Sequence, residues 1–157
     1  MANPAPTPPG LGFIFAARVT VDRPQELGDV AKGGRRIVPI TGGEFFGPDF
    51  RAEVLPGGSD WQVLRGDGVA ELEARYTLRT DDGALIYVRN CALRHGSAEA
   101  MAALAAGRAA DPASYYFRGA TFFETSAPRY AWLTRHIVVC TGEREPDCVK
   151  LNFYRLH

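Results

Sequence analysis

Short stretches of aromatic and β-branched residues, separated by turns built from Gly, Pro and Asp, divide the whole chain. Such stretches with short connections are typical of antiparallel strands. We expect about nine of them, which predicts a mainly all-β protein folded as a single antiparallel β-barrel with one short helix. The expected strands span residues 13–21, 35–41, 50–55, 61–64, 70–80, 85–93, 116–124, 130–141 and 148–156. Polar and aromatic residues interleave within these strands, which favours a barrel interior that is not purely apolar.

One segment has the composition of a helix. Residues 98–109 are mostly alanine, Ser97 is placed to cap their N-terminus, and Asp111-Pro112 follows as a stop signal. Residues 25–34 are polar and contain glycine, so we expect a loop there that holds at most one helical turn.

The length of 157 residues fits one domain. Residues 1–10 contain four prolines, which favours a disordered arm and leaves residues 11–157 as the barrel domain. This arm has no basic start and no apolar run, so we do not expect it to be a signal peptide. No apolar stretch is long enough to span a membrane. We therefore expect a cytoplasmic protein.

The charge balance narrows the range of partners. Lys plus Arg and Asp plus Glu both number 18, and there is no basic stripe or polybasic cluster. This argues against nucleic acid and against a membrane surface as partners. Barrels of this size can pair into homo-oligomers through an edge or a mouth, although no residue specifies such pairing.

The cysteines and histidines do not predict a metal site. Neither residue type shows the spacing of a zinc ligand set, and three cysteines form no disulfide framework. The chain also lacks a phosphate loop and a dinucleotide fingerprint. We therefore expect no metal and no cofactor, and we expect the cysteines to act as small buried hydrophobic residues. The residues concerned are Cys91, Cys140, Cys148, His95, His136 and His157.

The hairpin around Asp82-Gly83 separates the faces of two strands, if its loop has two or four residues. One face then carries Glu71, Glu73, Arg75, Thr77, Arg79, Ile86, Val88 and Asn90, and the other carries Leu72, Ala74, Tyr76, Leu78, Leu85, Tyr87, Arg89 and Cys91. The second face is the more apolar, so the simpler interpretation makes it the core. In the alternative, the first face lines a wet lumen in which Arg75 and Asn90 lie nearly opposite each other.

Seven short motifs occur in a fixed order along the chain: Thr41-Gly42-Gly43, Asp60-Trp61, Arg75-Tyr76, Asp82-Gly83, Tyr116-Phe117-Arg118, Phe123-Glu124 and Trp132-Leu133. In this order the chain resembles the family catalogued as domain of unknown function 3237, a group of small, mostly bacterial proteins. The resemblance runs from about residue 13 to residue 154. It implies a lipocalin-like antiparallel barrel and assigns no chemistry.

Two carboxylates are candidates for proton transfer. Asp60 follows the turn Pro56-Gly57-Gly58-Ser59 and could act as a general base at a barrel mouth. The favoured alternative is that Asp60 caps that turn and Trp61 fills the core. Glu124 lies between aromatic residues, where burial would raise its pKa and suit it to shuttle protons. The alternative for Glu124 is a structural ion pair with Arg118 or Arg75.

Six further residues are candidates for substrate binding: Trp61, Arg75, Tyr87, Asn90, Arg118 and Trp132. Arginine binds anionic groups through its planar fork, and the amide and phenol groups donate hydrogen bonds. The two tryptophans would form apolar walls. The simpler alternative is that the aromatic residues fill the core and that at least one arginine points into solvent.

These residues suggest a small-molecule-binding barrel. The first hypothesis is a cofactor-independent enzyme of the isomerase, lyase, hydratase or cyclase type, acting on a small organic, anionic substrate in the barrel. The alternative is a carrier or sensor with the same pocket and no turnover. A third is a structural protein with a fully packed, dry barrel. The polar content of the inward face distinguishes the three.

Overall fold

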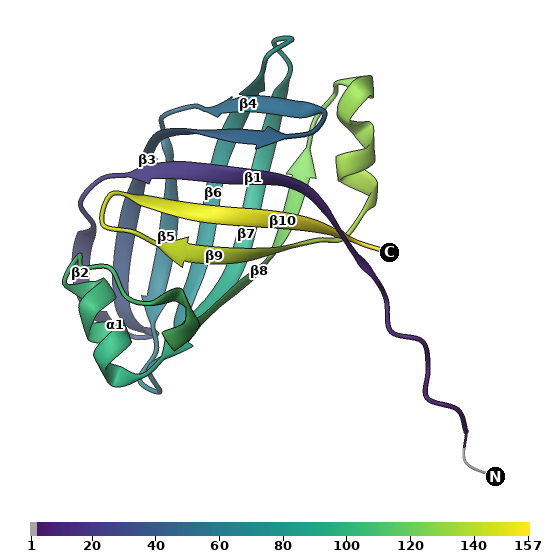
Figure 1. Cartoon of the computed structure of the whole chain (residues 1–157). Coiled ribbons are helices and arrows are strands. Elements are labelled where there is room, and N and C mark those ends of the chain that lie inside the picture. The colour runs from purple at the N-terminus through teal and green to yellow at the C-terminus, as the bar shows by residue number, and fades with distance from the viewer. Residues whose placement is uncertain (1–2) are drawn as a thin grey trace.

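The computed structural model describes residues 3–157, which form a closed antiparallel barrel (Figure 1). This confirms the expected mainly all-β class. The strands are β1 (Leu11–Val21), β2 (Gln25–Val30), β3 (Gly33–Gly47), β4 (Phe50–Val54), β5 (Gly58–Leu64), β6 (Ala70–Thr80), β7 (Leu85–Gly96), β8 (Tyr115–Glu124), β9 (Val138–Arg144) and β10 (Cys148–Leu156). One α-helix, α1 (Ala98–Ala105), and two 3-10 segments, η1 (Pro112–Ser114) and η2 (Pro128–Arg135), complete them.

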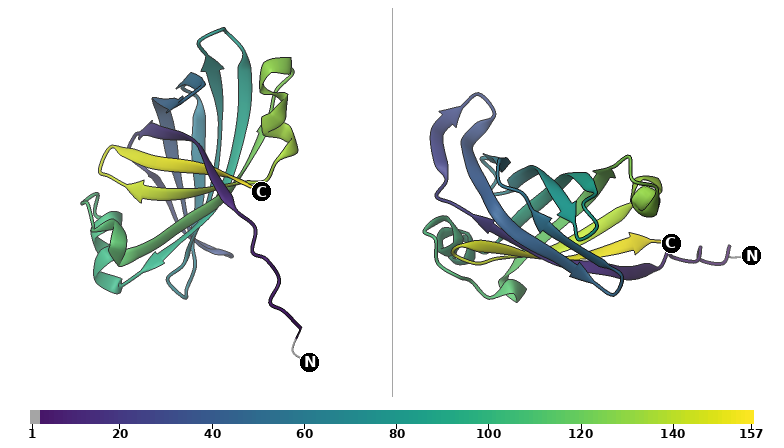
Figure 2. Two further views of the ribbon diagram at one scale, coloured as in Figure 1. Left: turned by 45° about the vertical axis from the view of Figure 1, so that its right-hand side comes forward. Right: turned by 90° about the horizontal axis from the view of Figure 1, so that it is seen from above.

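The barrel closes through its first and third strands. Strands β1, β10, β9, β8, β7 and β6 are consecutive antiparallel neighbours. One half of β6 then pairs with β5 and the other half with β4, and the long β3 pairs with both. Residues 40–46 of β3 finally pair with β1, while β2 adds an outer strand beside the start of β3 (Figure 2).

Two expectations about local structure were wrong. Residues 25–34 are not a helical loop, because β2 pairs with β3 there. The expected strand 130–141 begins instead as η2, which Pro128 starts and in which Tyr130 and Leu133 are buried against the core. Residues three apart lie on one side of a 3-10 helix, so this spacing suits η2 better than a strand.

The expected helix is confirmed in a shorter form. It ends at Ala105, and the Ser97 hydroxyl accepts a hydrogen bond of 3.1 Å from the backbone N–H of Ala100, as expected of a cap. Residues 3–10 are exposed and have no regular structure, and they run away from the barrel (Figure 1). Their disorder in solution stays a prediction. Within residues 3–157 there is no helix with the length and apolar character to cross a membrane.

The β6–β7 hairpin corrects the expected division of faces. A three-residue loop, residues 81–83, closes it, with a hydrogen bond of 2.9 Å from Thr80 N to Ala84 O. Because the loop is odd in length, Ala74 lies opposite Asn90, and even-numbered residues of both strands face the interior. The inward residues are Leu72, Ala74, Tyr76 and Leu78 of β6 and Ile86, Val88, Asn90, Ala92 and Arg94 of β7.

The barrel interior has two different halves. The aromatic half lies toward η2, and its centre is Phe15, whose ring contacts those of Phe45, Phe50, Phe123 and Phe153 at centroid distances of 4.7–5.9 Å. The other half lies toward α1, at the opposite end of the barrel (Figure 1). There, Leu104 of α1 packs on a smaller apolar cluster that comprises Ala70, Leu72, Ala92, Tyr115 and Phe117.

Candidate functional site

A polar cluster surrounds a small cavity of about 40 Å³ inside the α1 half of the barrel. We define the polar cluster as Asp60 and Gln62 of β5, Tyr76 of β6, Asn90 and Arg94 of β7, and Arg144 of β9. The cavity exists because two inward positions beside it, Ala74 and Ala92, carry only methyl side chains. A cavity of this volume and polarity can hold a molecule of the size of water.

Asp60 is the carboxylate of the polar cluster. Its residue is only partly buried, but its carboxyl oxygen Oδ1 is buried and has no hydrogen-bond partner among residues 3–157. Its other oxygen, Oδ2, accepts a bond of 2.8 Å from Gln62 Nε2. Burial raises the pKa of Asp60 above its usual value, and this outweighs the opposing effects of Gln62, Arg94 and Arg144. The carboxyl group therefore holds its proton to a higher pH than an exposed aspartate does.

Several polar atoms of the cluster are buried without partners. Within the described part of the chain these are Asp60 Oδ1, Gln62 Oε1, Tyr76 OH and Arg94 Nε. Buried polar groups are satisfied in most native proteins, and each exception costs ~1–3 kcal/mol. Water or a small polar ligand in the cavity would satisfy these four atoms.

Asn90 is held by its neighbours on β8 and β9. Its Oδ1 accepts a hydrogen bond of 2.8 Å from Thr121 Oγ1 and a longer one of 3.5 Å from Cys140 Sγ. Glycine is required next to it, because a Cβ at Gly119 would lie 2.7 Å from Asn90 Oδ1 and 3.0 Å from Cys140 Sγ. The amide of Asn90 is therefore fixed in orientation beside the cavity.

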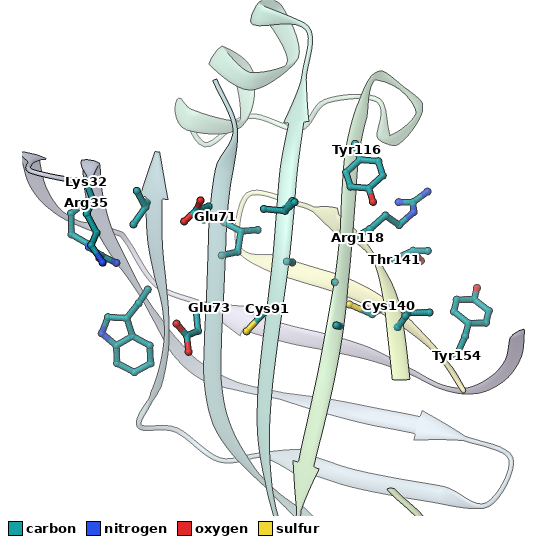
Figure 3. A pocket seen from close by; sticks show the side chains of 18 of the residues that line it. Lys32, Arg35, Glu71, Glu73, Cys91, Tyr116, Arg118, Cys140, Thr141 and Tyr154 are labelled. Carbon is teal, nitrogen blue, oxygen red and sulfur yellow. The ribbon is translucent and has the colours of Figure 1, made fainter. Parts of the chain in front are cut away.

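A second, larger hollow of about 880 Å³ lies on the outer face of strands β5 to β9 (Figure 3). Glu71 and Glu73 of β6 occupy its middle, with Lys32 and Arg35 on one side and Arg118 on the other (Figure 3). Arg75 lowers the pKa of Glu73 through a hydrogen bond, with a smaller contribution from Arg89. Glu73 therefore stays ionised, which suits it to bind cations rather than to transfer protons.

The two predicted catalytic residues lie apart. Asp60 lines the interior cavity, whereas Glu124 is exposed at the end of β8 and makes no ion pair within residues 3–157. Arg75, one of the ion-pair partners considered for Glu124, instead binds Glu73 at 2.5 Å. The structure thus brings only Asp60 into contact with the cavity.

The six predicted binding residues occupy four places. Asn90 lines the interior cavity, and Trp61 and Arg118 line the outer hollow. Arg75 and Tyr87 lie on the outer faces of β6 and β7, so that Arg75 and Asn90 point to opposite sides of the sheet. Trp132 belongs to η2 and packs against the aromatic half.

Four members of the polar cluster were not predicted as site residues: Gln62, Tyr76, Arg94 and Arg144. A signal for Arg94 exists in the sequence, because it continues the alternation of the buried residues Ile86, Val88 and Ala92 along β7. A charged residue in phase with apolar ones indicates a buried charge. Gln62 and Arg144 carry no comparable local signal.

One group of side chains has the geometry to hold a metal ion. The ligand atoms of Glu145, Asp147 and Cys148, at the β9–β10 turn, lie within 4.8 Å of one another. However, Glu145 is already paired with Lys150 at 2.5 Å, and burial raises the pKa of Cys148 to about 11, so its thiol is protonated at neutral pH. All three cysteines are free. The group therefore fits a metal poorly.

Comparisons with known proteins agree with this fold. The chain is 44% identical over 144 residues to a UPF0311 protein of Clostridium acetobutylicum, with 91% of each chain covered. It superposes on the crystal structure of a conserved protein of unknown function from Rhodopseudomonas palustris with a TM-score of 0.92, at 35% identity over 98% of this chain and 100% of that one.

A fungal relative has a named activity. The chain is 30% identical over 149 residues to the hydroalkoxylation enzyme phnH of Penicillium herquei, covering 94% of this chain and 82% of that protein. It also matches the crystal structure of an enzyme from the same fungus with a TM-score of 0.74 and 25% identity, over 99% and 100% of the two chains. The family model described as "Protein of unknown function (DUF3237)" matches residues 9–156. The resemblance in the sequence is thus confirmed, and the chain belongs to the DUF3237 family.

Proposed function

We propose that this protein is a cofactor-independent enzyme that adds an O–H group across a carbon–carbon double bond of a small organic molecule, or catalyses the reverse elimination, with Asp60 as the proton-transferring group. The observation that carries this proposal is the Asp60 carboxyl group, whose Oδ1 is buried and unpartnered beside a cavity. A raised pKa suits a carboxyl group to donate a proton near neutral pH.

In the addition direction, the neutral Asp60 carboxyl gives its proton to one alkene carbon. The substrate's hydroxyl oxygen forms a bond to the adjacent carbon, and the hydroxyl proton returns to the Asp60 carboxylate. No electrons are gained or lost, so an intramolecular reaction converts the substrate into an isomeric cyclic ether. Asn90, which is fixed by Thr121 and Gly119, is placed to orient a polar group of the substrate.

The relationship to a hydroalkoxylation enzyme supports this reaction class, because that activity joins an O–H group to an alkene without any change in oxidation state. It also agrees with the polar cluster, which offers proton transfer and hydrogen bonding. Among the isomerase, lyase, hydratase and cyclase activities that the sequence left open, we therefore favour hydration-type addition and ring closure.

The interior cavity is too small for such a substrate, so the α1 end of the barrel must open to admit it. A hollow of about 180 Å³ lies there, lined by residues that include Met101 and Ala105 of α1 and Arg94. Arg94 also lines the interior cavity, which makes this hollow the entrance nearest to the polar cluster. Entry there requires α1 to lift its buried Ala100, Ala103 and Leu104 from the barrel.

The test uses 2-allylphenol, 2-prenylphenol and unsaturated aliphatic alcohols as probes in D2O. We expect wild-type protein to form isomeric cyclic ethers that carry one deuterium on carbon, detected by NMR and mass spectrometry. Replacing Asp60 with Asn should lower the rate about 10²–10⁴-fold, because the amide cannot donate the proton. The matched control is Asp29→Asn, at an exposed position on β2.

The variant Glu124→Gln tests whether Glu124, the other predicted catalytic carboxylate, takes part in the reaction. Under this proposal it leaves the rate unchanged, because Glu124 is exposed on the outer surface. Undiminished turnover by a folded Asp60→Asn protein, or loss of turnover in Glu124→Gln alone, would show that Asp60 is not the proton-transferring group.

A carrier without turnover is the second candidate, and the outer hollow favours it. Its volume of about 880 Å³ lies within the range of ligand pockets, and Trp61 and Arg118 offer an aromatic wall and a cation. A ligand that co-purifies with the protein and is displaced by Trp61→Ala and Arg118→Met would favour this candidate.

A further inference from the structure

Arg94 is a buried cation without a partner. Only 6% of the residue is exposed, and within residues 3–157 its guanidinium has no ion pair and no side-chain hydrogen bond. Its one polar contact is with the face of the Phe117 ring, 5.7 Å from the guanidinium carbon to the ring centroid. Burial lowers the pKa of Arg94 to about 10, so it remains charged at neutral pH. A buried, unpaired charge is costly, and such groups are usually retained for function.

The neighbouring arginines Arg36 and Arg144 each have an ion-pair or hydrogen-bond partner, which Arg94 lacks among the described residues. Arg36 pairs with Glu26 at 3.3 Å. Arg144 donates from Nη1 to the backbone carbonyls of Glu145 and Cys148, at 2.7 and 3.2 Å. Because Arg36 and Arg144 both act to lower the pKa of Arg94, all three charges are close enough to repel. The α1 half of the barrel therefore carries uncompensated positive charge.

Asp60 compensates the charge of Arg94 only in part, because its charge raises the pKa of Arg94 while burial still lowers that pKa overall. Its carboxyl group makes no ion pair with Arg94, and burial favours its neutral form. In the neutral form that the proposed reaction requires, Asp60 provides no counter-ion to Arg94.

The surroundings of Arg94 define the chemical class of a ligand that would fit there. Arg94 lines both the interior cavity and the hollow beneath α1, so a ligand that enters there passes its guanidinium on the way to Asp60. Arg36 and Arg65 also line the hollow, whereas the lining of the interior cavity includes the apolar residues Leu72, Ala92 and Phe117. A ligand that fits this site must combine an anionic group with an apolar body.

We propose that Arg94 docks the carboxylate of a small organic acid, which enters beneath α1 and places its apolar body against Leu72, Ala92 and Phe117. The planar fork of a guanidinium matches the two oxygens of a carboxylate and binds them in parallel. This inference rests on the proposed function, because it names the substrate class that Asp60 would act on. Notably, the anchor is Arg94 rather than Arg75 or Arg118, which the sequence suggested.

The test measures binding without turnover. Benzoate and hexanoate serve as probes, benzamide as the uncharged analogue of benzoate, and inorganic phosphate as a small anion without an apolar body. We expect both carboxylates to raise the melting temperature of the wild-type protein and to give saturable heats in calorimetry. Benzamide and phosphate should have no comparable effect.

Three variants locate the binding site. Arg94→Met should weaken benzoate binding at least about tenfold while raising the melting temperature of the free protein, because a buried unpaired charge is removed. The matched control is Arg135→Met at the exposed end of η2, which should change neither property. Asp60→Asn should keep benzoate binding while losing turnover, so that failure of the reaction and failure of the docking site are distinguished.

Four outcomes would overturn the inference: no binding of either carboxylate, equal binding of benzoate and benzamide, equal protection by phosphate, or benzoate binding that survives Arg94→Met but is lost in Arg118→Met. The last outcome would place the site in the outer hollow. If Arg94→Met does not fold, the ¹⁵N–¹H signal of Arg94 Nε in the wild-type protein gives the answer. Benzoate should shift it strongly, and an unmoved signal would equally reject the inference.

Discussion

The two halves of the barrel interior are built on opposite principles. Toward η2, Phe15 and four other phenylalanines fill the space with rings in contact. Toward α1, the same inward faces carry Asp60, Asn90 and Arg94 around open volume. Close packing gives stability, whereas unsatisfied buried polar groups reduce it. The comparison indicates that the aromatic half holds the fold together and thereby allows the polar half to be a site.

The largest expected effect on stability comes from a substitution in the aromatic half. Phe15 is fully buried and contacts rings from β3, β4, β8 and β10. Phe15→Ala should lower the free energy of unfolding by about 3–5 kcal/mol, since it removes a large side chain and leaves a cavity. Urea denaturation followed by tryptophan fluorescence measures this. A loss below about 1 kcal/mol would mean that the aromatic half is not the main source of stability.

A pair of matched alanines compares the packing of the two halves directly. Ala17 is buried in the aromatic half, and Ala92 is buried beside the polar cavity. Ala17→Val should destabilise the protein by about 1–3 kcal/mol through overpacking, while Ala92→Val should cost less because its added methyl groups enter open space. Thermal unfolding of the two variants gives the comparison. In addition, only Ala92→Val should reduce benzoate binding and turnover. Equal destabilisation by both variants would show that the two halves do not differ in packing.

The pH dependence of stability sharpens the comparison for one group. Because the pKa of Asp60 is raised in the folded protein, the folded state binds this proton more tightly than the unfolded state does. This contribution is fully present below the unfolded pKa, near 3.8, and is lost as the pH rises through the folded pKa.

Asp60→Asn should therefore be more stable than the wild type at pH 7, by roughly 1–3 kcal/mol, and the difference should shrink toward pH 4. Arg94 and Arg144 face Asp60 and are positively charged throughout this range. Their charges lower the pKa of Asp60 and so partly offset the effect of burial. Urea titrations of both proteins across the range provide the measurement. A difference that does not vary with pH would mean that Asp60 titrates normally.

The sequence predicts the barrel well because strand signals are local. Aromatic and β-branched stretches correspond to the observed strands β1, β6, β7, β8 and β10, and Ser97 caps α1 as expected. The two segments that were misjudged depend on tertiary contacts. Residues 25–30 become a strand by pairing with β3, and η2 is favoured by burial of Tyr130 and Leu133 against the aromatic half.

The polar cluster is predicted less completely, because its members come together only when the faces are known. A change of one residue in the loop after Thr80 exchanges the inward and outward residues of a whole strand, and composition does not decide between two, three or four loop residues. Asp60 and Asn90 were found through their local surroundings. Arg144 lies far from them in sequence, and only the pairing of β9 and β10 with the rest of the sheet places it at the cavity.

The pairing of β1 with β10 has a consequence for synthesis. Leu11 lies opposite Leu156, so β1 leaves the ribosome long before the strand β10 with which it pairs. Until then the nascent sheet has open edges, and its phenylalanines are exposed to chaperones and to other nascent chains. Translation speed and chaperone supply should therefore affect the yield of this barrel more than they affect a helical protein of equal length.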